Sequence, residues 1–407
     1  MSKKNIINSW PSYSISESNL ISKTLLSNKV NYWTGNQTKK FENEFAKVIG
    51  SKYAIAVANG SLALELALRS LGLGSGDEVI VTSRTFVASA SSISNIGADP
   101  IFVDVDPNSG NISPKEILKA LTTKTKAIIC VHLAGWPCDM DSIMKIAYQN
   151  GIKVIEDCAQ AHGAKYKGKY VGSIGDIGTW SFCQDKIIST GGEGGMVTTN
   201  DNSLWKKMWS YKDHGKNHSI IFDGNQDQVG FKWVHDSIGT NFRMIEIQAA
   251  LGRFQLKKLN RWVKQRNKNA QAIFKILSKY ESIRIPDFKC SDTCKKDCHK
   301  AQGCLHAFYK CYVYVDQNFL KSNWSRNKII EEINKKNIPC YAGSCSEIYL
   351  EKAFEGYKKK PKERLFFAKL LGDSSLMFLV HPSISKENMN LCLSVIENVI
   401  LRATIKK

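Results

Sequence analysis

The feature that most constrains the fold of this chain is a regular alternation of buried-type strands and helices between residues 53 and 157. Short apolar runs predict strands at residues 53–58, 78–81, 101–105, 127–132 and 153–156, and the segments between them predict helices at 61–73, 86–96, 114–121 and 140–149. Strand–helix units of this length are typical of an α/β protein with a mostly parallel sheet that is covered on both faces.

Ligands of such sheets bind beyond the carboxyl ends of the strands, so the residues there are the first candidates for a site. Asn59 and Gly60 form a turn after the first strand, and Ser61 is predicted to open and cap the next helix, where free N–H groups attract anions. Phe86 follows another strand, and Asp157 directly follows residues 153–156. A buried Asp157 requires a cation, although capping of a helix explains this residue equally well when it is taken in isolation.

A lysine stands in the segment WSFCQDKIISTGGEGGMVTTN, which covers residues 180–200. Four glycines within Gly191–Gly195 allow positive φ angles and close backbone approach after Lys186. A lysine beside such a turn can hold a carbonyl as a Schiff base when burial or a neighbour lowers its pKa. A lone lysine before a glycine turn is more often an ordinary surface residue, so the hypothesis depends on the rest of the chain.

The remaining segments predict three regions. Residues 1–30 are predicted to be an N-terminal arm on the surface, residues 31–268 a large domain, and residues 269–407 a smaller α+β domain. In the large domain, Asn241 and Arg243 precede what reads as one long helix from Met244 onward. The small domain is predicted to contain a strand at 308–315 and helices at 327–336 and 389–405.

Composition restricts the partners. No apolar run approaches a membrane span and the first residues lack a secretory signal, so we expect a cytoplasmic protein that does not bind a membrane. The net charge is +20, and most of the excess falls after residue 250. Because the basic residues form no block interleaved with aromatics, solvated lysines are favoured over a nucleic-acid surface.

The 12 cysteines are scattered, which favours reduced thiols over a disulfide framework. Four of them, Cys290, Cys294, Cys298 and Cys304, crowd one polar loop together with His299 and His306. Their spacing matches no zinc knuckle or ribbon, so we predict a loop of reduced cysteines and no metal, with a metal site as the less favoured alternative.

The chain resembles the DegT/DnrJ-type (StrS-like) sugar aminotransferases, which depend on pyridoxal phosphate and have the aspartate-aminotransferase fold (fold type I). The resemblance runs from residue 33 to residue 382. It rests on motifs in the family's order and spacing: ANGSLALELAL, SRTFVASA, VHLAG, VIEDCAQAHG, SFCQDK, TGGEGGM and GTNFRMIEIQAALGRFQL.

The resemblance implies a role for each candidate residue. Lys186 would form the Schiff base with the cofactor aldehyde and then act as the base, and Asp157 would pair with the pyridine nitrogen. Gln160 would bind the ring hydroxyl and Phe86 would stack on the ring. The phosphate would be held by Gly60, Ser61 and Ser181, and by Asn241 of the second subunit.

The implied function is conversion of a keto- or aldehydo-sugar to an amino sugar, with glutamate as donor, in a homodimer with shared sites. A nucleotide-linked 4-keto-6-deoxyhexose is the expected acceptor, for lipopolysaccharide or surface-glycan synthesis. Cys183, Gln184 and Asp185 replace the aromatic or histidine residues that the family often has before the lysine. An eight-carbon ulosonic acid aldehyde therefore stays open as acceptor, and a non-catalytic cofactor-binding regulator is the alternative from another class.

Overall fold

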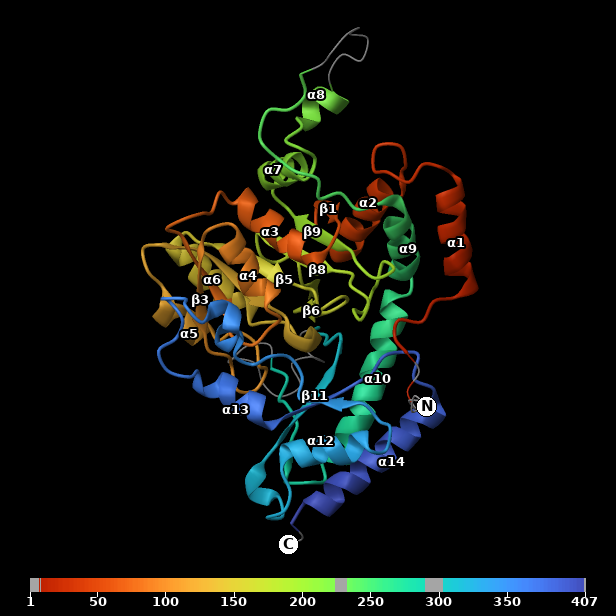
Figure 1. Cartoon of the computed structure of the whole chain (residues 1–407), viewed down its shortest axis with the longest axis vertical. Helices are drawn as coiled ribbons and strands as arrows, with labels where there is room; N and C mark the ends of the chain where they lie inside the picture. The colour runs from red at the N-terminus through yellow and green to blue at the C-terminus, as the bar shows by residue number, and fades with distance from the viewer. Residues whose placement is uncertain (1–6, 8, 224–232, 290–302, 406–407) are drawn as a thin grey trace.

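The core of the molecule is a seven-stranded sheet with the strand order β1-β9-β8-β5-β4-β2-β3 (Figure 1). The computed structural model describes residue 7 and residues 9–223, 233–289 and 303–405. Within this sheet, β9 runs against both of its neighbours and every other pair is parallel, so the predicted mostly parallel sheet is confirmed. The strands are β1 (Tyr53–Val57), β2 (Glu78–Thr82), β3 (Asp99–Val103), β4 (Thr125–Val131), β5 (Lys153–Asp157), β8 (Ile177–Ser181) and β9 (Gly195–Thr199).

Helices cover both faces of this sheet because successive strand residues point to opposite sides. The helices of this part of the chain are α2 (Gln37–Ile49), α3 (Gly60–Ser70), α4 (Ala88–Asn95), α5 (Pro114–Ala120), α6 (Met140–Asn150), α7 (Asn202–Lys212), α8 (His218–Phe222) and α9 (Glu246–Leu256). On β4, for example, Ile129 and Val131 pack in the core under α3, α4 and α7, whereas Ile128 and Cys130 pack in the core under α5 and α6. A two-stranded hairpin, β6 (Lys165–Tyr166) with β7 (Lys169–Tyr170), lies outside the main sheet.

A second, antiparallel sheet with the order β10-β11-β13-β12 forms the lower lobe in Figure 1. Its strands are β10 (Ile283–Arg284), β11 (Cys311–Val315), β12 (Cys340–Tyr341) and β13 (Ser375–Phe378), accompanied by α12 (Arg326–Asn334), α13 (Phe366–Ser374) and α14 (Lys386–Ala403). The strand and both helices predicted after residue 300 are therefore present, with shifted ends.

The single long helix predicted from Met244 is wrong, because the chain forms two helices, α9 and then α10 (Leu259–Leu277). The two helices serve different cores. Leu259 and Val263 at the start of α10 still pack with the large domain, whereas Ala270 and Phe274 further along pack in the core of the lower lobe. The predicted domain division at residue 268 falls inside α10.

The first residues contain a helix that the sequence did not predict, α1 (Ile15–Leu26), which begins with a capping box between Ser14 and Glu17. Glu17 is fully buried and accepts hydrogen bonds from Ser14 and from Gln255 of α9. Its ion pair with Lys258, at 3.0 Å, helps to hold α1 against the end of α9.

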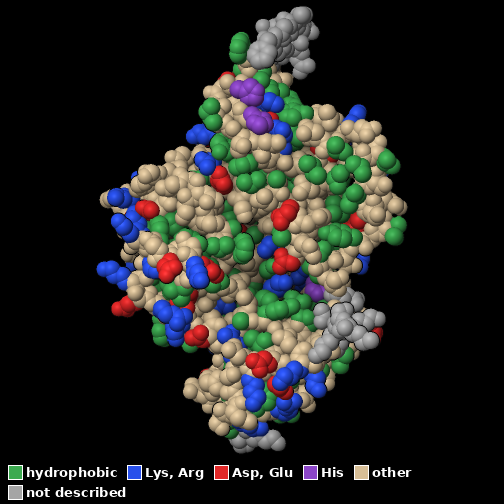
Figure 2. All heavy atoms as spheres, in the orientation of Figure 1, with side chains coloured by type: hydrophobic (Ala, Val, Ile, Leu, Met, Phe, Trp, Pro, Cys, Tyr) green, Lys and Arg blue, Asp and Glu red, His purple; other side chains and the backbone are tan. Residues whose placement is uncertain are grey.

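The surface carries both signs of charge. Figure 2 shows basic and acidic side chains interspersed over both lobes of the visible face. Several basic side chains of the lower lobe are paired, as in the Arg402–Glu332 and Lys279–Glu397 contacts. None of the helices in the described part of the chain combines the length and the apolar run that a transmembrane segment requires.

Candidate active site

Asp157 is the last residue of β5 and is only 5% exposed. Its Oδ2 accepts a hydrogen bond from Ser89 Oγ at 2.8 Å, and its Oδ1 accepts one from the Ala159 N–H at 3.1 Å. Burial raises the pKa of Asp157, and the charge of Lys186 is among the weaker effects that oppose this shift. Within the described residues Asp157 forms no ion pair, so it is a buried acid without a cationic partner.

Gln160 and Phe86 lie near this acid. Gln160 is 6% exposed, and its Oε1 accepts the Ala134 N–H at 2.8 Å, which leaves its amide NH₂ as a donor. Phe86 is in the loop before α4 and is 67% exposed, which is unusual for a large apolar ring. Ser89 joins the two regions, because its N–H donates to the Phe86 carbonyl while its hydroxyl donates to Asp157.

Lys186 lies in the loop between β8 and β9, with a side chain that is 16% exposed. Its Nζ is 3.9 Å from Asp185 Oδ1 and 4.8 Å from the centre of the Tyr309 ring. Its backbone carbonyl accepts a hydrogen bond from Trp10 Nε1 at 2.8 Å. The N-terminal segment is therefore hydrogen-bonded to the backbone of the loop that carries Lys186.

The glycines after Lys186 do what the sequence analysis expected of them. Gly191 and Gly192 have φ angles of 89° and 128°, a region that favours glycine. Gly194 and Gly195 instead allow close approach, because a Cβ at Gly195 would lie 2.3 Å from the Asn59 carbonyl oxygen. This contact brings the start of β9 against the turn that opens α3.

The three residues predicted to bind the phosphate, Gly60, Ser61 and Ser181, lie close together at the start of α3 and the end of β8. A Cβ at Gly60 would lie 2.6 Å from Ser181 Cβ, so only glycine lets the turn approach the end of β8 this closely. The predicted capping role of Ser61 is wrong: the helix begins at Gly60, and Asn59 caps it by accepting the Leu62 N–H. Asn59 has the extended backbone that an N-cap requires, and Ser61, inside the first turn, is exposed.

Asn241, the residue predicted to reach the phosphate of a second subunit, lies in the loop before α9. Its side chain is exposed, and its Oδ1 accepts the Arg243 N–H at 3.2 Å. The neighbouring backbone is tied to the end of β1 through the Ala58 N–H, which donates to the Phe242 carbonyl. The backbone beside Asn241 is therefore fixed at the end of β1, while its side chain stays exposed.

The residues present fit pyridoxal phosphate. The buried carboxylate of Asp157 lacks a cation, which a protonated pyridine nitrogen would supply, and the NH₂ of Gln160 is a donor for the ring hydroxyl. The exposed ring of Phe86 is available for stacking, and the α3 N-terminus beside Ser181 suits a phosphate. These residues come from separate strand ends, as the sheet topology predicted.

Several residues that contact Asp157 or the Lys186 loop were not predicted from the sequence. Ser89 lies three residues after Phe86, a spacing that could have suggested it, whereas Trp10, Tyr309 and Lys310 reach the loop from distant segments. No local pattern signals such long-range contacts.

The cysteine loop falls mostly outside the described residues, which include neither Cys290, Cys294 and Cys298 nor His299. Cys304 is buried, and its Sγ accepts the Lys167 N–H at 3.1 Å. His306 is buried and stacks on Phe308 with 3.7 Å between ring centres. The two described members of the loop therefore have packing roles.

The chain is similar to known proteins over most of its length. GDP-perosamine synthase of Escherichia coli O157:H7 is 46% identical over 236 residues, which are 58% of this chain and 62% of that protein. The pleiotropic regulatory protein of Geobacillus stearothermophilus is 43% identical over 243 residues, 60% of this chain and 62% of that protein. Both alignments thus span less than two-thirds of these relatives' own lengths.

The structural similarity is more extensive. The crystal structure of an aminotransferase from Psychrobacter cryohalolentis is 52% identical, with a TM-score of 0.93, and the match covers 98% of this chain and 99% of that chain. This match confirms the predicted fold, that of the type I pyridoxal-phosphate-dependent aminotransferases. The DegT/DnrJ/EryC1/StrS aminotransferase family matches residues 14–397, and the chain therefore belongs to this family.

Proposed function

We propose that this protein is a pyridoxal-phosphate-dependent aminotransferase that converts a carbonyl of a nucleotide-linked sugar to an amine, with glutamate as donor. The observation that carries the proposal is the buried Asp157 without a cation, on the same site as Lys186. Family membership and the relative named GDP-perosamine synthase support a nucleotide-linked acceptor, for which we propose a 4-keto-6-deoxyhexose. The product would serve surface-glycan synthesis in the cytoplasm.

The chain's own residues would divide the work. When bound, pyridoxal phosphate supplies an aldehyde and an electron-withdrawing ring. Asp157 would bind the ring nitrogen and keep it protonated, and Gln160 would orient the ring through its hydroxyl. Lys186 would hold the cofactor, and its amine would serve as the base for the proton transfer that transamination requires. Gly60, Ser61 and Ser181 would fix the phosphate, and Phe86 would cover one ring face.

Two alternatives have specific support. An eight-carbon ulosonic acid aldehyde is the second acceptor, because Cys183, Gln184 and Asp185 border the site and depart from the family's usual residues. A cofactor-binding regulator is the alternative from another class, and the relative named a pleiotropic regulatory protein favours it. A regulator has no need of the proton-transfer role of Lys186.

The visible absorbance of the purified protein tests the proposal. We expect a yellow protein whose band shifts when glutamate is added, and a Lys186→Ala variant that binds the cofactor non-covalently and loses turnover. Removal of a positioned base commonly costs about 10²–10⁴-fold in rate, and loss of the covalent link adds to this. A wild-type band that glutamate leaves unchanged, or full activity in Lys186→Ala, would contradict the assignment.

We further propose a homodimer in which Asn241 reaches the phosphate of the other subunit. The exposed Asn241 side chain supports this, as does Ile238, which is 92% exposed in the same loop. Because a ligand stabilises the state that binds it better, the cofactor should strengthen association. Sedimentation across a dilution series should show that apoprotein dissociates more readily than holoprotein, and Asn241→Ala should retain the cofactor less well. A monomeric and fully active holoprotein would refute the shared site while leaving the Lys186 chemistry intact.

A further inference from the structure

A polar pocket of about 150 Å³ lies beside the lysine loop, between the N-terminal segment, α10 and the second sheet. Its charged and aromatic lining residues are Trp10, Asp185, Arg266, Tyr309, Lys310, Tyr341 and His381. Of these, Asp185 alone belongs to the segment that the sequence analysis associated with the substrate. The others come from segments that are far apart in the sequence, between residues 10 and 381, and that the folded structure brings together.

One carboxylate and one ring of this pocket connect its Lys310 to Lys186 of the adjoining loop. Lys186 Nζ is 3.9 Å from Asp185 Oδ1, and Lys310 Nζ is 3.7 Å from Asp185 Oδ2. The same two ammonium groups lie 4.8 Å and 4.7 Å from the centre of the Tyr309 ring. The Tyr309 hydroxyl donates a hydrogen bond to Asp185, which holds the carboxylate between the lysines. A molecule that reacts at Lys186 is therefore within reach of Lys310.

A third cation lies behind this group. Arg266 is 1% exposed, and its Nη1 donates to the carbonyls of Tyr309 and Phe308 at 3.1 and 3.3 Å. Its Nε and Nη2 have no hydrogen-bond partner among the described residues. The Trp10 ring covers the guanidinium at 5.0 Å, so the arginine acts on the pocket through its charge and through the backbone that it holds.

The charges of the pocket do not balance. Lys186, Lys310 and Arg266 face one acid, Asp185, and His381 is kept neutral because burial lowers its pKa to about 3. When the amine of Lys186 is engaged with the cofactor, two cations and one anion still line the pocket. Charges in a partly buried site with an excess of one sign favour a ligand of the opposite sign. Lys310 is the group best placed to contact it, because its side chain is 17% exposed whereas Arg266 is covered.

We propose that Lys310 binds a carboxylate of the substrate in this pocket, with Asp185 and Tyr309 positioning the lysine and Arg266 supplying further positive charge. The inference rests on the proposed aminotransferase function, because it identifies a chemical feature of the molecules that this same site takes. The carboxylate comes either from the amino donor or from a sugar acid as acceptor. An ammonium-to-carboxylate hydrogen bond in a partly buried site contributes enough affinity to be measured by truncation of the lysine.

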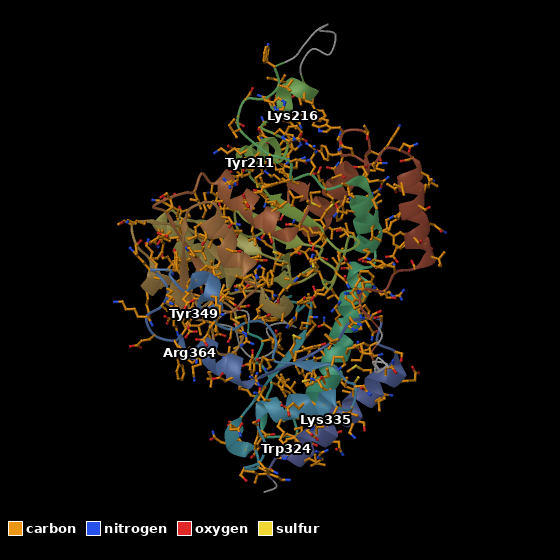
Figure 3. All side chains as sticks on the ribbon, in the orientation of Figure 1. Tyr211, Lys216, Trp324, Lys335, Tyr349 and Arg364 are labelled. Carbon is orange, nitrogen blue, oxygen red and sulfur yellow. The ribbon has the colours of Figure 1, made fainter. Side chains whose placement is uncertain are left out.

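The test is calorimetric binding to the holoprotein of two acids, glutarate as a donor-like dicarboxylate and glucuronate as a sugar acid, with glucose as the uncharged reference. The variants are Lys310→Met, which removes the charge with little change of shape, and Lys310→Arg, which keeps it. Lys335→Met is the matched control, because Lys335 is an exposed lysine of the lower lobe, paired with Glu332 far from the loop (Figure 3).

We expect Lys310→Met to weaken binding of at least one acid roughly tenfold or more, Lys310→Arg to restore most of it, and Lys335→Met to have no effect. Loss confined to glutarate assigns the carboxylate to the amino donor, and loss confined to glucuronate assigns it to the sugar. Wild-type protein that binds neither acid, or binding that Lys310→Met leaves within twofold, would overturn the inference. The absorbance response to glutamate distinguishes a failure of this inference from a failure of the proposed function. If glutamate shifts the visible band of the wild-type protein, the proposed aminotransferase function is supported whatever Lys310 binds.

Discussion

Two adjacent acids at the end of β5, Glu156 and Asp157, are both almost completely buried, but their surroundings differ completely. Glu156 is 0% exposed and Asp157 5% exposed. Successive strand residues point to opposite faces, so one acid lies on the α6 side of the sheet and the other on the α4 side. Burial acts on both in the same direction, and the difference between them comes entirely from their partners.

Glu156 has a full set of donors. Its oxygens accept the N–H groups of Gly172, Ile174 and Gly175 at 2.7–2.8 Å, and His132 Nε2 lies 3.0 Å away. These partners, above all His132, outweigh burial and lower the pKa of Glu156. The hydrogen bonds of this carboxylate therefore connect β5 to the loop before β8.

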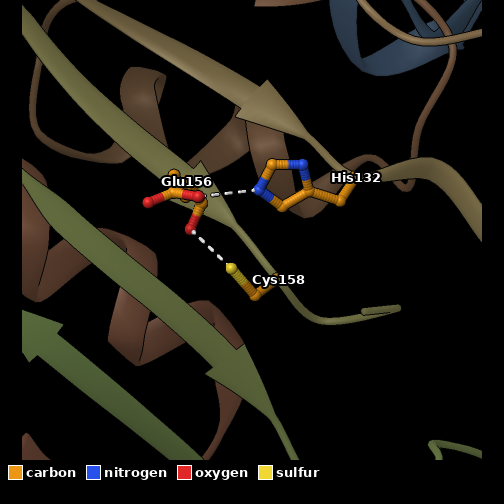
Figure 4. A group of neighbouring side chains, drawn as sticks. All are labelled: His132, Glu156 and Cys158. Carbon is orange, nitrogen blue, oxygen red and sulfur yellow. Dashed lines mark hydrogen bonds and ion pairs between the residues drawn. The ribbon is translucent and has the colours of Figure 1, made fainter. Parts of the chain in front are cut away.

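His132, Glu156 and Cys158 lie close enough together to suggest a metal site (Figure 4). The hydrogen bonds favour another interpretation. His132 Nδ1 accepts the Cys138 N–H at 3.0 Å, so the ring carries its proton on Nε2 and donates it to Glu156. Both ring nitrogens are thus occupied, and the group is a hydrogen-bond network in the protein interior.

Asp157 has two hydrogen bonds and no cation among the described residues. The comparison teaches that burial of an acid does not identify a functional site, whereas a deficit of partners does. Glu156, whose oxygens all have partners, stabilises the fold. Asp157 has fewer partners, lies in the same site as Lys186 and is available to a ligand.

The largest effect that we expect is on the chemistry of Asp157. Asp157→Asn removes the anion that keeps the ring nitrogen protonated, so turnover should fall by about 10²–10⁴-fold while the fold persists. Single-turnover kinetics with glutamate, followed by absorbance, measure this effect. A wild-type rate in the variant would show that Asp157 has another role. The smaller number of partners around Asp157 than around Glu156 would then not mark a catalytic residue.

The contrast also explains which parts of the site could be predicted from the sequence. The strand ends, Asp157 and the glycines after Lys186 are local patterns, because periodicity and glycine content act on neighbouring residues. The Lys186–Asp185–Tyr309–Lys310 group depends on long-range packing across two lobes, which no local pattern encodes. The break between α9 and α10 was missed for the same reason, since no Gly or Pro marks it and the two helices simply follow different cores.

The second effect concerns the stability that Glu156 provides. Glu156→Gln places an NH₂ group against N–H donors, and we expect a loss of about 3 kcal/mol in the free energy of unfolding. Because the folded pKa of Glu156 lies below its unfolded value, its contribution to the free energy of unfolding is present at neutral pH and is lost as the pH falls through the folded pKa. Denaturant unfolding of wild type and variant across pH measures the loss in the variant and its dependence on pH. Glu116→Gln, the same change at a half-buried acid paired with the exposed Lys119, should cost less than about 0.5 kcal/mol. Equal losses in the two variants would contradict the structural role of Glu156.

A smaller effect of opposite sign is expected when Asp157→Asn is examined without the cofactor. Burial raises the folded pKa of Asp157 above its unfolded value, so the ionised acid costs stability as the pH rises through the folded pKa. The apo variant should therefore be more stable than apo wild type at neutral pH and equal to it in acid. Thermal unfolding of both apoproteins across pH measures this difference. A variant less stable than wild type at every pH would show that Asp157 is already satisfied, like Glu156.

The smallest effect concerns Ser89, which supplies one of the two hydrogen bonds of Asp157. The Ser89 hydroxyl lies 2.8 Å from Asp157 Oδ2, and this bond lowers the pKa of the acid. Ser89→Ala should therefore raise that pKa further and reduce turnover by about two- to tenfold, since the net contribution of a typical hydrogen bond is about 0.5–1.5 kcal/mol. Ser92, on the same helix α4, is a matched control, because its buried hydroxyl has no partner within the described residues. Ser92→Ala should leave turnover unchanged and should not reduce stability. Steady-state rates of both variants across pH measure these effects. If turnover fell as far in Ser92→Ala as in Ser89→Ala, the packing of α4, and not the hydrogen bond to Asp157, would control the activity of the site.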